Sequence, residues 1–257
     1  MLAGEPVKLV KCETNDLEVP ADAEIIIEGE ILPDHKVEEG PFGEYTGYRT
    51  SPRDFRVTFR VNCITYRNNA TMTISNMGVP QDEGQLLRSF SLGLELDKLL
   101  RSQGIPITGV YMHPRSTHHM MIVGVKPTYA GIAMQIAQLA FGSKLGPWFH
   151  MVMVVDDQTD IYNWDEVYHA FCTRCNPERG IHVFKNTTGT ALYPHANPHD
   201  RKWSIGSQVL FDCLWPVDWD KINDVPSLVS FRNVYPKDVQ DKVLSNWTNY
   251  GFAPVAR

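Results

Sequence analysis

The chain has 257 residues, enough for one large domain or two modest ones, and its 43% hydrophobic and 21% charged residues are ordinary for a globular protein. Its net charge of -6 argues against a nucleic-acid-binding protein, because neutralising phosphates requires concentrated Lys and Arg. No apolar run is long enough to span a bilayer and no signal-peptide core opens the chain, so we expect a cytoplasmic protein without a membrane partner.

The first 80 residues are predicted to form antiparallel β structure, as part of a barrel or a sandwich. The chain opens abruptly on a short alternating strand at residues 7–11, as an interior segment of a domain would. A turn at Pro20 leads to a strand rich in β-branched residues at 24–30, which feeds a loop rich in Gly and Pro.

The clearest strand signal is at residues 55–62, where apolar residues alternate with polar ones, so that one face of the strand is apolar and the other is basic. This pattern predicts that the apolar face is buried and the basic face is solvated. The pair Asn68-Asn69 is predicted to form a turn, because Asn tolerates positive φ, and residues 71–75 are predicted to return as the partner strand. The apolar residues of this strand are Phe55, Val57, Phe59 and Val61.

The period becomes helical after residue 80, which marks a domain junction. Asp82 is the predicted N-cap, and Gly104 followed by Pro106 is predicted to end the helix. The apolar residues on or near one stripe of this helix are Leu86, Leu87, Phe90, Leu94 and Leu99.

Strands and helices then follow in the order β-β-α-β-α, which predicts a compact α+β layer domain over residues 81–205. Residues 206–257 are predicted to be an irregular tail that ends in an amphipathic helix between Pro236 and Gly251. The expected elements of the α+β domain are strands at 107–112, 120–125 and 149–155 and helices near 129–141 and 164–172.

The stretch 38–48 (EEGPFGEYTGY) places carboxylates among Gly, Pro and aromatic residues. Glu39 and Glu44 are five residues apart, so they can meet only if the Gly-Pro-Phe-Gly segment between them bends the chain back. Burial beside rings and a second carboxylate both raise a carboxyl pKa, which yields a proton donor usable near neutral pH. From these residues alone two interpretations stay open: a paired acid/base site, or two solvated loop charges, the commoner state of Glu.

Other polar residues give weaker signals. Cys172 and Cys175 have the spacing of a zinc or redox pair, but no second Cys-x-x-Cys supplies the remaining ligands, so core packing is favoured. The five cysteines lack the spacing of a disulfide framework and are expected to be reduced. Lys144 lies in a glycine-containing loop, from which a lysine is able to reach a phosphate, although solvent exposure is the default for a lone Lys.

The histidines are a further candidate for metal binding. His118-His119 is one pair, and His195 and His199 form another that Pro198 interrupts, so both imidazoles of this pair do not share one helix face. Surface loop positions are therefore favoured over a metal site for these histidines.

Five segments together carry a family resemblance: 12–15 (CETN) with 19–21, 39–44 (EGPFGE), 64–70 (ITYRNNA), 170–175 (AFCTRC) and 246–248 (NWT). The chain resembles the UbiD-type, prenylated-flavin-dependent decarboxylases over nearly its whole length. It resembles only the C-terminal half of such an enzyme. The resemblance implies the second part of an antiparallel, flavin-binding split β-barrel in residues 1–80, followed by an α+β oligomerisation domain and a C-terminal helix.

The resemblance also implies the chemistry. In this family, reversible decarboxylation of aromatic or α,β-unsaturated acids proceeds through a covalent adduct with prenylated FMN, inside a glutamate-arginine-glutamate network. Carried over by position, Glu44 is similar to the general acid/base, Glu39 to its partner glutamate, and Lys144 to the lysine near the cofactor phosphate. The positions that resemble the lining of the substrate pocket are Tyr45, Thr190 and Leu192.

Parts of the family site have no counterpart in this sequence. The catalytic arginine and the residues that hold a divalent metal, with potassium as a further candidate, belong to the N-terminal half, so no metal ligand is assigned here. We therefore expect a subunit or C-terminal portion of a decarboxylase that needs a second polypeptide for the N-terminal half and forms a homo-oligomer through the α+β domain. An isolated or degenerate fragment, or a non-catalytic assembly partner of a decarboxylase complex, is the alternative.

Overall fold

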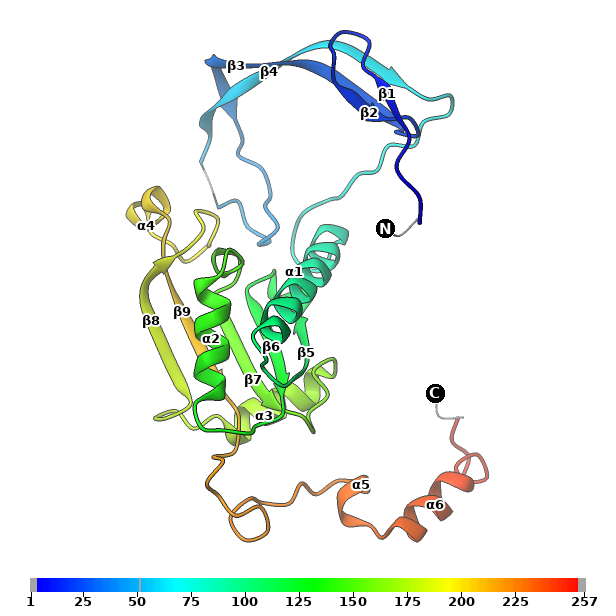
Figure 1. The fold of residues 1–257 in the computed structure, drawn as a ribbon, viewed down its shortest axis with the longest axis vertical. Coiled ribbons are helices and arrows are strands. Elements are labelled where there is room, and N and C mark those ends of the chain that lie inside the picture. The colour runs from blue at the N-terminus through cyan, green and yellow to red at the C-terminus, as the bar shows by residue number, and fades with distance from the viewer. Residues whose placement is uncertain (1–3, 51, 254–257) are drawn as a thin grey trace. The chain divides into compact units, whose positions relative to one another are not determined.

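A computed structural model describes residues 4–50 and 52–253 (Figure 1). Its helices and strands mix along the chain, in agreement with the predicted α+β class. The described chain divides into two units, residues 4–127 with 131–214 and residues 128–130 with 215–253. Among the described residues, no helix is long and apolar enough to cross a membrane.

The chain begins with two short strands, β1 (Leu9–Lys11) and β2 (Glu18–Pro20), which pair antiparallel. The turn between them is held by the buried carboxylate of Glu28, which accepts hydrogen bonds from the backbone N–H groups of Glu13 and Thr14, both at 2.8 Å. Because buried carboxylates need such partners, the segment 12–15 is tied to the strand that carries Glu28.

A two-stranded ribbon follows, formed by β3 (Ile25–Glu39) and β4 (Asp54–Tyr66). The strands pair antiparallel from Ile25 opposite Tyr66 to Glu39 opposite Asp54. β3 is therefore longer than predicted, and its last residue, Glu39, lies at the end of the ribbon. β4 pairs with β3 rather than with residues 71–75, which form no strand, although Asn69 adopts the predicted positive φ of 59°.

The alternating face of β4 is not buried as predicted. The ribbon has only two strands, and the side chains of this face are largely exposed to solvent. The four apolar side chains are between 46% and 59% exposed: Phe55, Val57, Phe59 and Val61.

The helix α1 (Glu83–Ser102) begins at the predicted N-cap. Asp82 accepts a hydrogen bond from the backbone N–H of Gln85 at 2.8 Å, and the Gln85 side chain accepts one from the N–H of Asp82 at 3.0 Å, which is a capping box. The predicted apolar stripe is mostly exposed, with Leu87 and Phe90 at 70% and 68%. The side of α1 that is buried consists of Gln85, Ser89, Gly93, Leu96 and Leu100.

The larger sheet has five strands in the order β5-β6-β7-β9-β8. β6, β7 and β9 are parallel, and β5 and β8 are antiparallel edge strands. β5 and β6 confirm the predicted strands, whereas β8 and β9 had no predicted counterpart and the irregular tail expected from residue 206 begins only after β9. The bounds are β5 (Ile107–Met112), β6 (Met120–Val125), β7 (Met151–Asp156), β8 (Ile181–Thr188) and β9 (Ile205–Asp212).

Helices pack on both faces of this sheet, α1 and α2 (Ile132–Gly142) on one and α3 (Trp164–Arg174) on the other (Figure 1). The period-2 alternation of the strands sorts their side chains between the two cores. In β6, Val123 belongs to the core beneath α1 and α2, whereas Ile122 belongs to the core beneath α3. The remaining short elements of this unit are η1 (Pro114–Ser116), η2 (Gly146–Trp148) and α4 (Pro198–Trp203).

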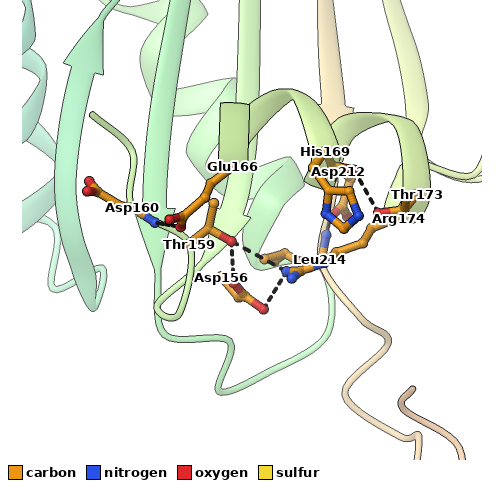
Figure 2. A network of polar contacts seen from close by, with 9 residues as sticks. All are labelled: Asp156, Thr159, Asp160, Glu166, His169, Thr173, Arg174, Asp212 and Leu214. Carbon is orange, nitrogen blue, oxygen red and sulfur yellow. Dashed lines mark hydrogen bonds and ion pairs between the residues drawn. The ribbon is translucent and has the colours of Figure 1, made fainter. Parts of the chain in front are cut away.

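A nearly buried ion pair fixes the end of α3 (Figure 2). Arg174 Nη1 lies 2.7 Å from Asp156 Oδ2, and both side chains are only 11–12% exposed. Thr159 donates a hydrogen bond to the other carboxylate oxygen of Asp156, also at 2.7 Å. The carboxylate at the end of β7 therefore holds the last turn of α3 through its guanidinium partner.

The second unit contains α5 (Phe231–Val234) and α6 (Lys237–Ser245). α6 begins after Pro236, as predicted, and Gly251 adopts a φ of 89° beyond its end. The Gln240 side chain donates hydrogen bonds to the backbone oxygens of Arg232 and Tyr235, which ties the two helices together.

Candidate active site

The loop between β3 and β4 turns sharply and brings the two predicted glutamates together. Gly40 and Gly47 have φ values of 83° and 81°, which favour glycine. The N–H of Gly47 donates to the backbone oxygen of Glu44 at 2.9 Å, and the N–H of Glu44 donates to that of Tyr48 at 3.1 Å. This hydrogen-bonded turn places Glu44 back beside the end of β3, as the pairing of the two glutamates requires.

Glu39 and Glu44 line one pocket of about 170 Å³. Its walls come from the end of β3, the loop, the first residues of β4 and one residue of the segment after β8. The complete lining is Glu39, Gly40, Pro41, Phe42, Glu44, Pro52, Asp54, Arg56 and Leu192.

The pKa of Glu44 is raised above its ordinary value. Partial burial is the main cause, and the negative charge of Glu39 adds to it. Both causes act in the way predicted from the sequence, because each of them disfavours a second negative charge in the pocket. The arrangement therefore provides a carboxyl group that holds its proton to a higher pH than a solvated glutamate does.

Arg56 and Asp54 belong to the pocket and were not singled out in the sequence. Arg56 Nε lies 3.9 Å from Glu39 Oε2, and its Nη1 donates a hydrogen bond to Asp54. Both residues lie at the start of β4, where this strand pairs with the end of β3. The polar face of the β4 alternation was visible in the sequence, but only the register with β3 shows that it reaches Glu39.

Leu192 is the one predicted substrate-pocket residue in the lining. Its backbone N–H faces Thr190 Oγ1 at 3.4 Å, so Thr190 supports the segment without lining the pocket. Arg201 fixes this segment further, because its guanidinium donates to the backbone oxygens of Ala191 and Tyr193, both at 3.0 Å, and to that of Thr50 in the β3–β4 loop. Arg201 thus joins two pocket segments, a role that no local sequence pattern indicated.

Tyr45, the neighbour of Glu44, is buried and does not line the pocket. Its ring centroid lies 5.2 Å from that of His118 and 6.0 Å from that of His119, and its backbone oxygen accepts a hydrogen bond from Gln85 at 2.7 Å. Tyr45 therefore anchors the glutamate loop to α1 and to the segment before β6.

The prediction of surface positions is wrong for His118 and His119, which are 1% and 7% exposed. His118 packs against Tyr45, whereas His119 belongs to an aromatic cluster with His150, Tyr193 and His195. Burial lowers the pKa of His119 to about 3 and that of His150 to about 4, with neighbouring imidazoles adding to the effect. These imidazoles are neutral at physiological pH.

The remaining candidates have no metal-binding geometry. In residues 4–50 and 52–253, no group of three or more His, Cys, Asp or Glu side chains is placed to hold a metal ion. His199 is exposed, as expected. Cys175 lies against the core beneath α3, as predicted for core packing, whereas Cys172 is exposed. All five cysteines are free thiols.

Lys144 lies outside the pocket lining, exposed in the connection between α2 and η2. An exposed ammonium in a loop suits a phosphate, so it fits one end of a flavin nucleotide. The pocket at Glu44 fits the reacting end, since a carboxyl group with a raised pKa stands at its wall. At about 170 Å³, the pocket is smaller than the roughly 300–1,000 Å³ of typical ligand sites, so it is too small to hold a whole flavin nucleotide.

Two family models match the chain. Residues 1–80 match the 3-octaprenyl-4-hydroxybenzoate carboxy-lyase Rift-related domain (UbiD), and residues 85–213 match the 3-octaprenyl-4-hydroxybenzoate carboxy-lyase C-terminal domain (UbiD_C). The chain is 31% identical over 261 residues to ferulic acid decarboxylase 1 of Saccharomyces cerevisiae, covering 98% of this chain and 52% of that protein. The chain thus spans about half the length of the curated relatives it matches.

Solved structures show the same fold. The vanillic acid decarboxylase ShVdcCD of Sedimentibacter hydroxybenzoicus, in its open form with truncated ShVdcD, matches with a TM-score of 0.79 and 25% identity over 95% of this chain and 50% of that one. The UbiD-class enzyme HmfF of Pelotomaculum thermopropionicum, in complex with FMN, matches with a TM-score of 0.74 and 30% identity over 88% of this chain and 49% of that one.

Proposed function

The chain belongs to the UbiD family of carboxy-lyases, and on that basis we propose that it supplies the proton-transfer part of a reversible, non-oxidative decarboxylase that uses prenylated FMN. The proposed substrates are aromatic or α,β-unsaturated carboxylic acids. The single observation that carries the proposal is the pairing of Glu39 and Glu44 in one pocket, with the pKa of Glu44 raised by burial and by its neighbour.

Glu44 is the proposed general acid/base. When the bond between the substrate carbon and its carboxylate breaks, CO2 leaves and the proton of Glu44 passes to that carbon. In the reverse direction the Glu44 carboxylate takes the proton from the carbon that accepts CO2. A carboxyl group with a raised pKa suits both steps, because its two protonation states are more evenly populated near neutral pH.

Glu39 is the proposed partner of Glu44. Its charge helps to keep the proton on Glu44, and Arg56 at 3.9 Å limits the accumulation of negative charge. Prenylated FMN, when bound, supplies the acceptor for the electron pair that CO2 leaves behind. Lys144 is proposed to hold its phosphate, which explains a lysine in an exposed connection away from the proton donor.

Leu192, Tyr45 and Thr190 are proposed to shape the substrate site. Leu192 does so by direct contact, since it lines the pocket. Tyr45 and Thr190 act through the segments they hold, because Tyr45 fixes the glutamate loop against α1 and Thr190 supports the backbone of Leu192.

We further propose that a second polypeptide, carrying the N-terminal half of the family enzyme, completes this site together with its divalent metal. Three observations support this proposal: the small pocket, the exposed apolar face of β4 and the match to half the length of the relatives. The α+β domain is the part of the chain through which we propose that a homo-oligomer forms. A non-catalytic assembly partner is the second candidate, which the same exposed face favours.

The test is reconstitution. The chain is combined with a UbiD-type N-terminal-half protein and prenylated FMN, and CO2 release from an aromatic acid is measured. Glu44→Gln is expected to lower the rate about 100-fold to 10,000-fold, as loss of a general acid/base does. Glu38→Gln is the matched control, because Glu38 is the neighbour of Glu39 but pairs with Arg53 at 3.2 Å, outside the pocket lining.

The outcomes separate the two candidates. Turnover that Glu44→Gln abolishes and Glu38→Gln leaves intact supports the catalytic role. A complex that forms and turns over equally well with Glu44→Gln assigns the proton donor elsewhere and leaves this chain as an assembly partner.

A further inference from the structure

Two cysteines from distant parts of the sequence meet at the end of the core beneath α3. Cys175 is the C-cap residue of α3, and Cys213 directly follows β9. Both side chains pack in this core, where Cys213 is fully buried and Cys175 is half-buried. The spacing in the sequence pairs Cys175 with Cys172, whereas the fold pairs it with Cys213.

The backbone around Gly180 holds the two sulfurs in this position. The oxygen of Gly180 accepts a hydrogen bond from the N–H of Asp212 at 2.7 Å, and the Cys175 thiol donates to the same oxygen at 3.6 Å. A Cβ at Gly180 would lie 2.8 Å from the oxygen of Asp212, so this close approach of the two segments requires glycine. On the other side, the N–H of Cys213 donates to the oxygen of Val154 in β7 at 2.9 Å. Both cysteines are therefore anchored on ordered segments, and the Cys213 thiol donates a hydrogen bond to the Cys175 sulfur.

The two thiols differ in how readily they lose a proton. Burial is the main cause that raises the pKa of each thiol. The hydrogen bond between them opposes the rise at Cys175 and adds to the rise at Cys213. Two charged neighbours also act, since Asp212 raises the pKa of both thiols and Arg174 opposes the rise at Cys213. Cys175 is thus the more reactive thiol, because the thiolate is the nucleophilic form and solvent reaches this sulfur.

We propose that Cys175 and Cys213 form a reversible disulfide when the protein meets a peroxide, which makes the pair a redox modification site. Neither cysteine lines the pocket of Glu39 and Glu44, so the inference does not rest on the proposed function. Hydrogen peroxide suits the site, because a small neutral oxidant is able to reach a half-buried sulfur. Cys175 supplies the attacking sulfur, and Cys213 supplies the sulfur that completes the bond.

The reaction has two steps. The Cys175 thiolate attacks one oxygen of the peroxide, the O–O bond breaks and hydroxide leaves, which turns Cys175 into a sulfenic acid. The Cys213 sulfur then attacks the Cys175 sulfur, the S–O bond breaks, and the oxygen leaves as water with the proton of Cys213. The hydroxide of the first step takes the proton that Cys175 lost. In total the two thiols lose two electrons and two protons, and the peroxide is reduced to two molecules of water.

The bond would join the end of α3 to the chain just before the second unit begins at residue 215. It closes a loop that contains β8, α4 and β9. A crosslink of this kind restricts the unfolded chain more than the folded one. The midpoint of thermal unfolding is therefore expected to rise by about 5 °C or more on oxidation.

The experiment detects the bond directly. The full chain, with any protein that co-purifies, is reduced with dithiothreitol, treated with hydrogen peroxide, alkylated under denaturing conditions and digested for peptide mass spectrometry. We expect a peptide pair linked through Cys175 and Cys213 that dithiothreitol separates again. The rate of its formation should rise about 10-fold from pH 7 to pH 8, because the thiolate population grows in this proportion below the pKa of a thiol.

Three variants assign the sulfurs. Cys213→Ala should abolish the link and the rise in the thermal midpoint, and should leave Cys175 to be oxidised further to a sulfinic acid. Cys175→Ser should also abolish the link, and it decides the question if Cys213→Ala does not fold by circular dichroism. Cys172→Ser is the matched control, since it removes the exposed thiol of the same helix and should change neither the link nor the thermal midpoint.

Three results overturn the proposal. The first is a link between Cys172 and Cys175 in the unaltered chain, and the second is a link that disappears in Cys172→Ser. The third is a chain in which peroxide modifies Cys172 while Cys175 and Cys213 are both recovered in alkylated form, which would show that burial keeps the pair reduced.

Discussion

The five-stranded sheet and the β3–β4 ribbon of the first unit differ in how far their apolar residues are buried. The five-stranded sheet is covered on both faces, so that Val123 and Ile122 in adjacent positions of β6 are both fully buried. The β3–β4 ribbon pairs over 12 positions, yet Phe55 and Val57 of its apolar face are 59% and 52% exposed. An isolated two-stranded ribbon is marginal in water, and large exposed apolar patches mark interaction surfaces.

The five-stranded sheet therefore has a complete hydrophobic core within the chain, whereas the β3–β4 ribbon contributes one apolar face that stays largely exposed. The glutamate loop belongs to the second region, since it joins the two strands of the ribbon. The candidate site therefore lies in the region with the smaller core of its own, and Arg201 in α4 and Gln85 in α1 link its loop to the α+β domain.

We expect the largest effect on stability when a charge is placed in the core between the five-stranded sheet and its helices α1 and α2. Val154 in β7 is fully buried in the core beneath α1 and α2. Val154→Asp should lower the free energy of unfolding by at least about 4 kcal/mol, because an unpaired carboxylate would be buried there. Urea denaturation followed by circular dichroism measures the loss.

Val57→Asp on the ribbon is the matched substitution. It should change the free energy of unfolding by less than about 0.5 kcal/mol, as for an exposed position, but it should prevent association with a completing polypeptide. If Val57→Asp unfolds the chain as Val154→Asp does, the ribbon face is packed within the chain and the contrast between the two sheets is lost.

The second-largest expected effect is the loss of stability at low pH. Imidazoles in the unfolded chain titrate near a pKa of 6.5, whereas the pKa values of His119 and His150 are about 3 and about 4. Between these values the unfolded state binds more protons, so stability is lost as the pH falls below about 6.5. At about pH 5 the loss should approach about 2 kcal/mol for each histidine, measured by urea denaturation across pH.

The control is His199→Gln, which changes an exposed histidine and should leave this pH profile unaltered. His150→Phe should remove part of the acid sensitivity. A profile that stays flat between pH 7 and pH 5 would show that the imidazole cluster takes up protons without cost.

Local signals predicted the fold well where one element decides its own structure. Asp82 caps α1 because its carboxylate and the Gln85 side chain act within one turn, and β5 and β6 are found because their apolar runs are short and bounded by turns. The bend that pairs Glu39 with Glu44 was also foreseeable, since Gly and Pro confine the loop to few paths.

Long-range packing was not predictable in the same way. β9 contains Gly206, Ser207 and Gln208, and it becomes a sheet strand because β7 and β8 flank it. The buried side of α1 includes Gln85, whose amide donates to the Tyr45 backbone oxygen, so a polar residue is inside where hydrophobicity alone points to leucines.

The candidate site also contains residues that the sequence indicates and residues that only long-range contacts bring to it. The sequence pointed to Glu39, Glu44 and Leu192, and all three line one pocket; the acid/base role of the glutamates and the substrate contact of Leu192 are proposals. Arg56 and Arg201 were missed, because strand register places the first and a contact across 151 positions of sequence places the second.

The smallest predicted effect lies in the ribbon's loop, where Glu44→Gln tests the electrostatics without a substrate. The folded-state pKa of Glu44 is raised, so the charged carboxylate is disfavoured in the fold and the stability this group contributes is lost as pH rises through that raised pKa. Glu44→Gln should therefore slightly increase stability near neutral pH and have no effect under acidic conditions, where the carboxyl is protonated in both states. Urea denaturation at both pH values measures the difference, with Glu38→Gln as the control. A loss of stability at neutral pH with Glu44→Gln would mean that the Glu44 carboxylate is stabilised in the fold, and the pairing with Glu39 would then fail as an account of its pKa.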